Sequence, residues 1–214
     1  MAFVPDLPVI LAFALAAIVL AITPGPDMAL FLSRAVNYGR AHGLACLFGA
    51  ITGLVLHSLL AALGISILIA AAPTAFLVLK IAGALYLLYL AFQALRSGST
   101  LALAASARSQ PRLGESYFTG LGINLLNPKI ILFFVTFLPQ FVDRHDPAAS
   151  GKLLFLGLEF IVVSLPLTVG MVYAAGWLAE LLIRQAWVGR LLNWSFAAVF
   201  AGFAATILFA EGRR

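Results

Sequence analysis

Charged residues are scarce in this 214-residue chain: Lys, Arg, Asp and Glu together make up 10% of it, while 63% of the residues are apolar. A soluble domain carries about 25% charged residues, and a chain of this length has too little interior to bury so much apolar surface. A spanning helix needs about 20 apolar residues. The composition therefore excludes an ordinary soluble enzyme domain and predicts an all-α integral membrane protein with about six transmembrane helices.

Cysteine is represented by Cys46 alone, which excludes an intrachain disulfide and a cysteine-based metal site. We expect Cys46 to be a small core residue of an apolar helix. The chain also lacks a Walker-type phosphate loop, a His-Glu-x-x-His motif and a Gly-x-Ser-x-Gly elbow. These absences argue against ATP-driven transport by this chain alone, against a metal site and against catalysis, so we expect no cofactor.

The basic residues, which give a net charge of +5, stand singly at the ends of apolar runs. They form no basic stripe, so we expect no nucleic-acid partner and attribute them to orientation in a bilayer. Connections after the first, third and fifth predicted helices hold Arg34, Arg40, Arg96, Arg108, Arg112, Arg184 and Arg190. The opposite side holds Arg144, Lys152, Arg213 and Arg214. The excess predicts both termini outside, although the C-terminal arginine pair opposes this orientation.

Apolar runs bounded by charge, proline and glycine predict helices at about 7–35, 43–70, 74–95, 116–138, 152–182 and 189–209. A polar linker at 96–115 divides the single membrane domain 1–214 into a half at 1–95 and a half at 116–214. Each half opens with a helix that proline interrupts, at Thr23–Pro26 and at Asn127-Pro128. Three helices per half place the halves in opposite orientations, so we predict inverted three-helix repeats with a binding site at the breaks.

Asp27 is the most informative single residue, because it follows Thr23-Pro24-Gly25-Pro26 at the expected depth of the membrane. A carboxylate within a spanning helix costs at least about 2.5–3.5 kcal/mol. Pro24 and Pro26 break the helix ladder and Gly25 permits unusual backbone angles, so a helix restarting at Pro26 has its positive end beside Asp27. Asp27 either caps this half-helix or acts in function, where it binds a substrate ammonium and takes up a proton.

The segment Asn127-Pro128-Lys129 is the corresponding break in the fourth predicted helix. Irregular backbone is tolerated at membrane depth where it lines a cavity, and its freed carbonyl and N–H groups can hold polar ligands. Lys129 either binds a substrate carboxylate, neutralises Asp27 or extends along its stem to the interface. We therefore expect this segment to share a binding site with Asp27.

His57 follows Gly49 and Gly53 at four-residue steps in the second predicted helix. Small residues mark a close helix contact, within one chain or between two, so we expect His57 to point into protein. It acts there as a proton relay or as a neutral hydrogen-bonding group. Lys80 and Glu159 are accessory site candidates: Lys80 more readily extends to the interface, and Glu159 is either interfacial or a second proton site.

Short motifs spread over nearly the whole chain carry a family resemblance. In chain order they are Thr23-Pro24-Gly25-Pro26-Asp27, then Gly49, Gly53 and His57, Lys80-Ile-Ala-Gly83-Ala-Leu-Tyr86-Leu, Asn124-Leu-Leu-Asn127-Pro128-Lys129, Phe133-Phe134 and Pro139-Gln140-Phe141. Together they resemble the LysE/RhtB family of bacterial amino-acid exporters, in the lysine-exporter superfamily. The resemblance adds Asn124, Gln140 and Tyr86 as accessory site residues, although packing also explains Tyr86.

The resemblance implies a six-helix exporter that moves amino acids or close derivatives out of the cytoplasm across the bacterial inner membrane, driven by the proton gradient. Its partners would be an amino acid, protons, the lipid bilayer and, if a glycine face pairs, a second copy of the chain. The substrate ammonium would meet Asp27 and its carboxylate Lys129 or exposed N–H groups, and protonation of Asp27 or His57 would release it. The alternatives are an exporter of another small solute or metal cation, a non-transporting membrane assembly protein and a membrane-embedded enzyme.

Overall fold

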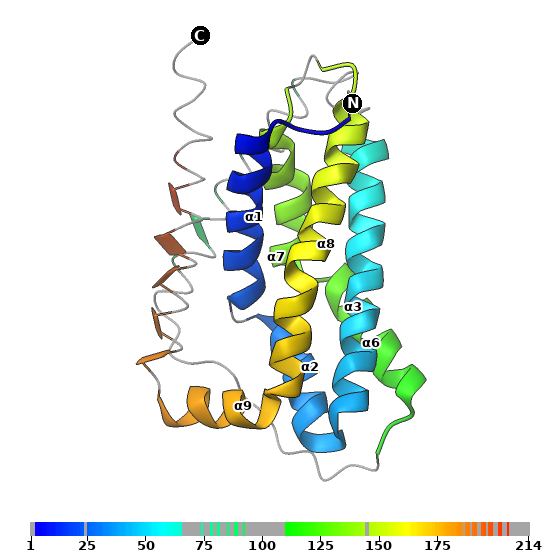
Figure 1. Cartoon of the computed structure of the whole chain (residues 1–214), viewed down its shortest axis with the longest axis vertical. Helices are drawn as coiled ribbons and strands as arrows, with labels where there is room; N and C mark the ends of the chain where they lie inside the picture. The colour runs from blue at the N-terminus through cyan, green and yellow to red at the C-terminus, as the bar shows by residue number, and fades with distance from the viewer. Residues whose placement is uncertain are drawn as a thin grey trace.

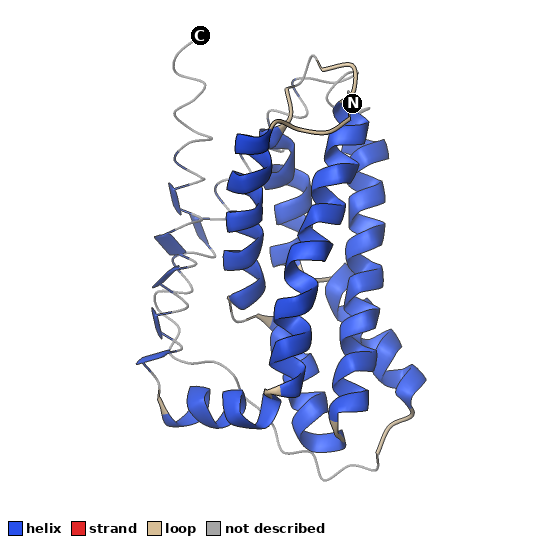
Figure 2. Ribbon diagram, in the orientation of Figure 1, coloured by secondary structure: helices blue, strands red, loops and turns tan. Residues whose placement is uncertain are grey.

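The computed structural model describes residues 3–23, 25–65, 110–143 and 146–185, together with isolated residues in the ranges 74–92 and 187–205. Every regular element in this described part is helical (Figure 2). The predicted all-helical membrane architecture is therefore confirmed. The third and sixth predicted helices fall largely outside the described residues, although the isolated described residues between 74 and 92 are helical.

The first predicted helix is broken where the prolines require it. It consists of α1 (Leu7–Ile22) and α2 (Pro26–Tyr38), which meet at a bend of 53°. Gly25 is fully extended at the break, and Pro26 begins α2, where its missing N–H is not needed. Together the two segments are long and apolar enough to form one bent span.

The fourth predicted helix is broken in the same way at Asn127. It consists of α6 (Leu113–Leu125) and α7 (Pro128–Leu132), and the α6 axis is bent by 49° relative to the part after the break. A π-helical turn, η2 (Phe133–Phe137), and a 3-10 turn, η3 (Leu138–Phe141), continue the span to its end. The α6 helix begins at Leu113, three residues before the predicted start near residue 116.

Two helices cross the molecule without a break: α3 (Arg40–Leu60), which continues through a π-helical turn η1 (Ala61–Ile65), and α8 (Ala149–Tyr173). Each is long and apolar enough to span a membrane, so the described residues hold up to four spans when each bent pair counts as one. The α1 and α8 helices run in one direction along the bundle, and α3 and the α6–α7 pair run in the other (Figure 1). The two broken spans are therefore antiparallel, as inverted halves require.

The predicted end of the fifth helix, near residue 182, is wrong. The α8 helix ends at Tyr173, and a separate helix, α9 (Ala175–Arg184), lies across the end of the bundle (Figure 1). Since the 25 residues of α8 already suffice to cross a membrane, a continued helix would carry the apolar side chains of α9 into water, whereas turning aside leaves only polar groups such as the Glu180–Arg184 ion pair, at 2.9 Å, to be exposed. Ala175 remains buried against the cluster around α2, which holds the start of α9 in place.

A close contact between α3 and α6 depends on glycine. A Cβ on Gly49 would overlap the backbone of Tyr117, and a Cβ on Gly120 would overlap the carbonyl oxygen of Cys46. The predicted close contact of the glycine face is thus confirmed, and it lies within one chain. Cys46 is buried beside it, as expected.

The core consists of two apolar clusters stacked along the bundle. One joins α1, η2 and α8 through rings that include Phe13, Phe133 and Phe160, with Phe13 and Phe133 centroids 5.7 Å apart. The other joins α2, α3 and the end of α8 around Phe31 and Leu47. Along the chain, the first break separates the α1 residues of one cluster from the α2 residues of the other.

We predict that Gly120→Ala destabilises the protein by about 1–3 kcal/mol, because the added methyl group forces α3 and α6 apart. Gly122→Ala is the matched control in the same helix, since a Cβ there meets nothing within 4 Å. It should leave stability unchanged or raise it by up to about 1 kcal/mol through helix propensity. Reversible unfolding in detergent measures both, and equal stabilities for the two variants would contradict the assigned contact.

Candidate functional site

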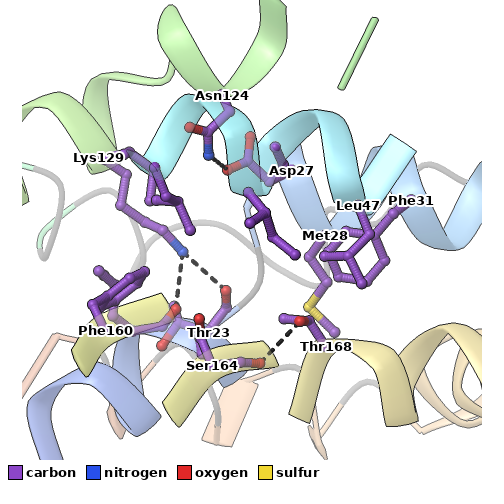
Figure 3. Close-up of a pocket in the computed structure, with 16 residues that line it drawn as sticks. Thr23, Asp27, Met28, Phe31, Leu47, Asn124, Lys129, Phe160, Ser164 and Thr168 are labelled. Carbon is purple, nitrogen blue, oxygen red and sulfur yellow. Dashed lines mark hydrogen bonds between the residues drawn. The ribbon is translucent and has the colours of Figure 1, made fainter. Parts of the chain in front are cut away.

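The two helix breaks are joined by a hydrogen bond from one half of the chain to the other. Asn124, at the end of α6, donates from Nδ2 to Oδ2 of Asp27, at the start of α2, over 2.7 Å (Figure 3). Asn124 is 1% exposed, and Gly53 of α3 packs against its side chain. The motif residue Asn124 is therefore a direct partner of the Asp27 carboxylate.

A second connection also runs from the fourth span to the first, but it starts after the break in the fourth span and ends before the break in the first. Nζ of Lys129 donates to the carbonyl oxygens of Leu20 and Thr23 over 3.2 and 3.1 Å. The carbonyl of Leu20 is free of the helix ladder because the residue four positions later, Pro24, has no N–H. Of the roles left open for Lys129, extension to the interface is therefore wrong. The Asp27 carboxylate also acts electrostatically on the Lys129 ammonium.

Asn127 and Pro128 build the break itself. The Asn127 side chain accepts from the backbone N–H of Lys129 over 3.0 Å and so caps α7, while Pro128 occupies its first position. Asn127 is 2% exposed, and its Nδ2 is buried with no hydrogen-bond partner among the described residues. This geometry fixes where the Lys129 side chain starts.

A cavity opens where the two breaks meet, with an empty volume of about 520 Å³ that includes its open mouth. It is lined by Leu20, Ala21, Thr23, Asp27, Met28, Phe31, Leu47, Ala50, Ile51, Leu54, Asn124, Lys129, Ile130, Phe160, Ser164 and Thr168. Of the residues predicted for the site, the structure brings Thr23, Asp27, Asn124 and Lys129 to this cavity. Gly25, Pro26, Asn127 and Pro128 shape the breaks without lining it, and Pro24, Lys80 and Tyr86 lie outside the described residues.

The polar wall of the cavity holds acceptor atoms that can take a further hydrogen bond. Oδ1 of Asp27 and Oδ1 of Asn124 are both buried, and neither has a hydrogen-bond partner in the described part of the chain. Buried acceptors of this kind cost free energy unless a donor reaches them. The site therefore holds one carboxylate with an oxygen that can accept a further donor, and one ammonium that rests on backbone carbonyls.

His57 lies behind Asn124 and does not line the cavity. It is 7% exposed, its Nε2 is 3.5 Å from the Asn124 carbonyl oxygen, and its ring stacks on Phe134 with centroids 5.6 Å apart. The prediction that His57 points into protein is confirmed. Asn124 thus contacts Asp27 through its side chain and His57 through its backbone, so one residue connects the two groups predicted for proton coupling.

Two other predicted accessory residues lie apart from the cavity. Gln140 donates to the Thr136 carbonyl over 2.8 Å within its own turn of helix. Glu159 is partly buried on α8, and its Oε2 is buried without a partner among the described residues. A role for Glu159 as a second proton site stays a prediction. No group of three or more His, Cys, Asp or Glu side chains that could hold a metal ion occurs in the described part of the chain.

The sequence interpretation missed Ser164 and Thr168, which bring hydroxyl groups from α8 to the cavity. They flank Pro166, which lies inside the same helix. Two hydroxyl residues one turn apart, on either side of a proline in an apolar helix, were the signal that could have identified them.

We predict that Asn127→Ala lowers stability by about 1 kcal/mol, because it removes the oxygen that caps α7. Asn127→Ser keeps an oxygen within reach of the same N–H and should retain most of the stability. Thermal unfolding of the substrate-free protein in detergent compares the two. The capping role would be disproved if the alanine and serine variants lost equal stability.

Comparison with known proteins agrees with this arrangement. The family described as LysE type translocator matches residues 18–211. A homoserine/homoserine lactone efflux protein of Salmonella typhimurium is 30% identical over 88% of this chain and 90% of its own length. An uncharacterised membrane protein of Vibrio cholerae is 32% identical over 92% and 95%, and a leucine efflux protein of Salmonella choleraesuis 27% over 91% and 92%. No solved structure matches. The chain belongs to the LysE type translocator family.

Proposed function

We propose that this protein is a secondary active exporter of amino acids or close derivatives, and that it exchanges them for protons. The observation that carries the proposal is the cavity between two broken helices, which holds one carboxylate able to accept a further donor and one ammonium. An amino-acid zwitterion offers the complementary pair of charges. The names of the relatives, homoserine and leucine efflux proteins, support the same substrate class.

The substrate ammonium binds Asp27. Oδ1 of Asp27 has no partner among the described residues, whereas Oδ2 is already held by Asn124, so an arriving donor satisfies the carboxylate without breaking the existing hydrogen bond. Asp27 lies in the first turn of α2, at the positive end of this helix. The substrate carboxylate binds the Lys129 ammonium, which lines the same cavity.

Proton exchange follows from competition for the same carboxylate. A proton on Asp27 removes its charge and so weakens ammonium binding on the outer face. His57 contributes through the Asn124 carbonyl, because a change in the charge of His57 alters its hydrogen bond to the residue that positions Asp27. The two bent spans are the elements that rock around this site, because their breaks are the points at which each changes direction.

We further propose that the protein lies in the bacterial cytoplasmic membrane with both termini outside. Arg34, Arg40 and Arg112 lie near the end of the bundle where α3 and α6 begin, and α9 crosses the same end (Figure 1). At the opposite end, Lys152 donates to Asp146 over 2.5 Å, and this bond holds the pKa of Asp146 below its usual range. The arginine-rich end is the one expected in the cytoplasm.

We predict that Asp27→Asn reduces proton-stimulated amino-acid efflux about 10- to 100-fold, the loss expected for one charge-assisted hydrogen bond. Purified protein in proteoliposomes, tested with a panel of labelled amino acids with and without a proton gradient, measures it. Asp143→Asn is the control, because Asp143 is an exposed loop carboxylate remote from the cavity. Unchanged coupling in Asp27→Asn at every pH tested would remove Asp27 from the exchange. Absence of efflux for every amino acid would favour another small solute or a metal cation as cargo.

We predict that single-cysteine variants will show both termini outside. The variants are made in a background where the buried Cys46 is replaced by alanine. Ser150→Cys, exposed in the first turn of α8, should react with a membrane-impermeant maleimide on intact cells. Gly114→Cys, exposed in the first turn of α6, should react only after the cells are permeabilised. The reverse pattern would place both termini in the cytoplasm.

A further inference from the structure

Ser164 and Thr168 bring a second polar feature to the cavity, separate from the charged residues. Both lie on α8, one helical turn apart, and Pro166 stands between them. In Figure 3 they occupy the wall opposite Asp27 and Asn124. Ser164 is 5% exposed, so its hydroxyl group is available to the cavity and hardly to solvent.

The hydroxyl protons of both residues are already used within α8. Oγ1 of Thr168 donates to the carbonyl oxygens of Ser164 and Leu165, over 2.9 and 3.2 Å, and Oγ of Ser164 donates to Ile161 over 3.4 Å. A hydroxyl group has one proton and two acceptor lone pairs. The pair therefore offers acceptors to the cavity, and the ligand group that suits them is a hydrogen-bond donor.

The surroundings of this hydroxyl pair are apolar. Met28, Phe31 and Leu47 line the same cavity and belong to the buried cluster of α2 and α3. An apolar wall by itself discriminates weakly between a methyl group and a hydroxyl group of similar size, whereas a site with hydrogen-bonding groups discriminates strongly. The two oxygens on α8 are thus positioned to decide which side chains are accepted.

We infer that Ser164 and Thr168 read the end of the substrate side chain and favour a hydroxyl group there over a methyl group of the same size. The inference rests on the proposed function, in which Asp27 and Lys129 hold the ammonium and carboxylate common to every amino acid. With these groups fixed at the helix breaks, the side chain is the part of the ligand left to meet α8. A side-chain carboxylate is disfavoured at the same position, because it brings a further acceptor and no donor.

Homoserine and norvaline test this assignment, because they differ only in a terminal hydroxyl or methyl group. In proteoliposomes at limiting concentration, the unaltered protein should export homoserine about tenfold faster than norvaline, the ratio that one net hydrogen bond supports. The double variant Ser164→Ala, Thr168→Val should bring the ratio close to one. Thr119→Val is the matched control, since it removes an exposed hydroxyl that also donates to its own helix, on α6, and should keep the tenfold ratio.

Each result separates this inference from the proposed function. If the unaltered protein exports homoserine and norvaline at similar rates, or exports neither of them but does export another amino acid, the hydroxyl assignment is overturned and the proposed exporter function stands. A tenfold ratio that survives in a folded double variant also overturns it. If the double variant does not fold, the single variants, checked by gel filtration in detergent, decide by the same criterion. No efflux of any amino acid from folded unaltered protein overturns the proposed function, and this inference with it.

Discussion

The structure depends on the crossed pair of contacts between its two helix breaks. A break at membrane depth frees backbone groups that water cannot reach, and each such group costs several kcal/mol unless protein satisfies it. Lys129 of the fourth span satisfies the carbonyls of Leu20 and Thr23 in the first, and Asn124 holds the Asp27 carboxylate at the start of α2. The first break therefore depends on Lys129 of the fourth span for its carbonyl groups, and the two spans meet where both are broken.

Packing in other parts of the bundle holds the two helix breaks together. Asn124 can reach Asp27 because α6 lies close to α3, and that approach is possible only without side chains at Gly49 and Gly120. The apolar clusters on either side of the breaks hold α1, α2 and α8 around them. One methyl group added to the α3–α6 contact therefore shifts Asn124 relative to the Asp27 carboxylate, although the methyl group itself touches no ligand.

The sequence predicted the features that follow from local chemistry. Proline lacks an N–H, so the breaks near Asp27 and Asn127 could be placed, and small residues four apart predicted the α3 contact face. It could not say which way the Lys129 side chain turns, since that depends on carbonyls about a hundred residues away in the chain. Ser164 and Thr168 escaped notice because hydroxyl groups in apolar helices commonly bond to their own helix, which gives no indication of the face they occupy.

The charge balance of the cavity bears on the energy source of the proposed exchange. Asp27 and Lys129 carry opposite charges, so the site is neutral when empty and stays neutral with a bound zwitterion. Once the substrate leaves and Asp27 takes up a proton, the cavity carries the charge of Lys129 alone. The return of this positively charged site is then favoured by a membrane potential negative inside, by up to about 2.3 kcal/mol per 100 mV for a full crossing of the field. Under the proposed mechanism, Lys129 therefore makes the return step sensitive to voltage as well as to pH, even though the cargo itself carries no net charge.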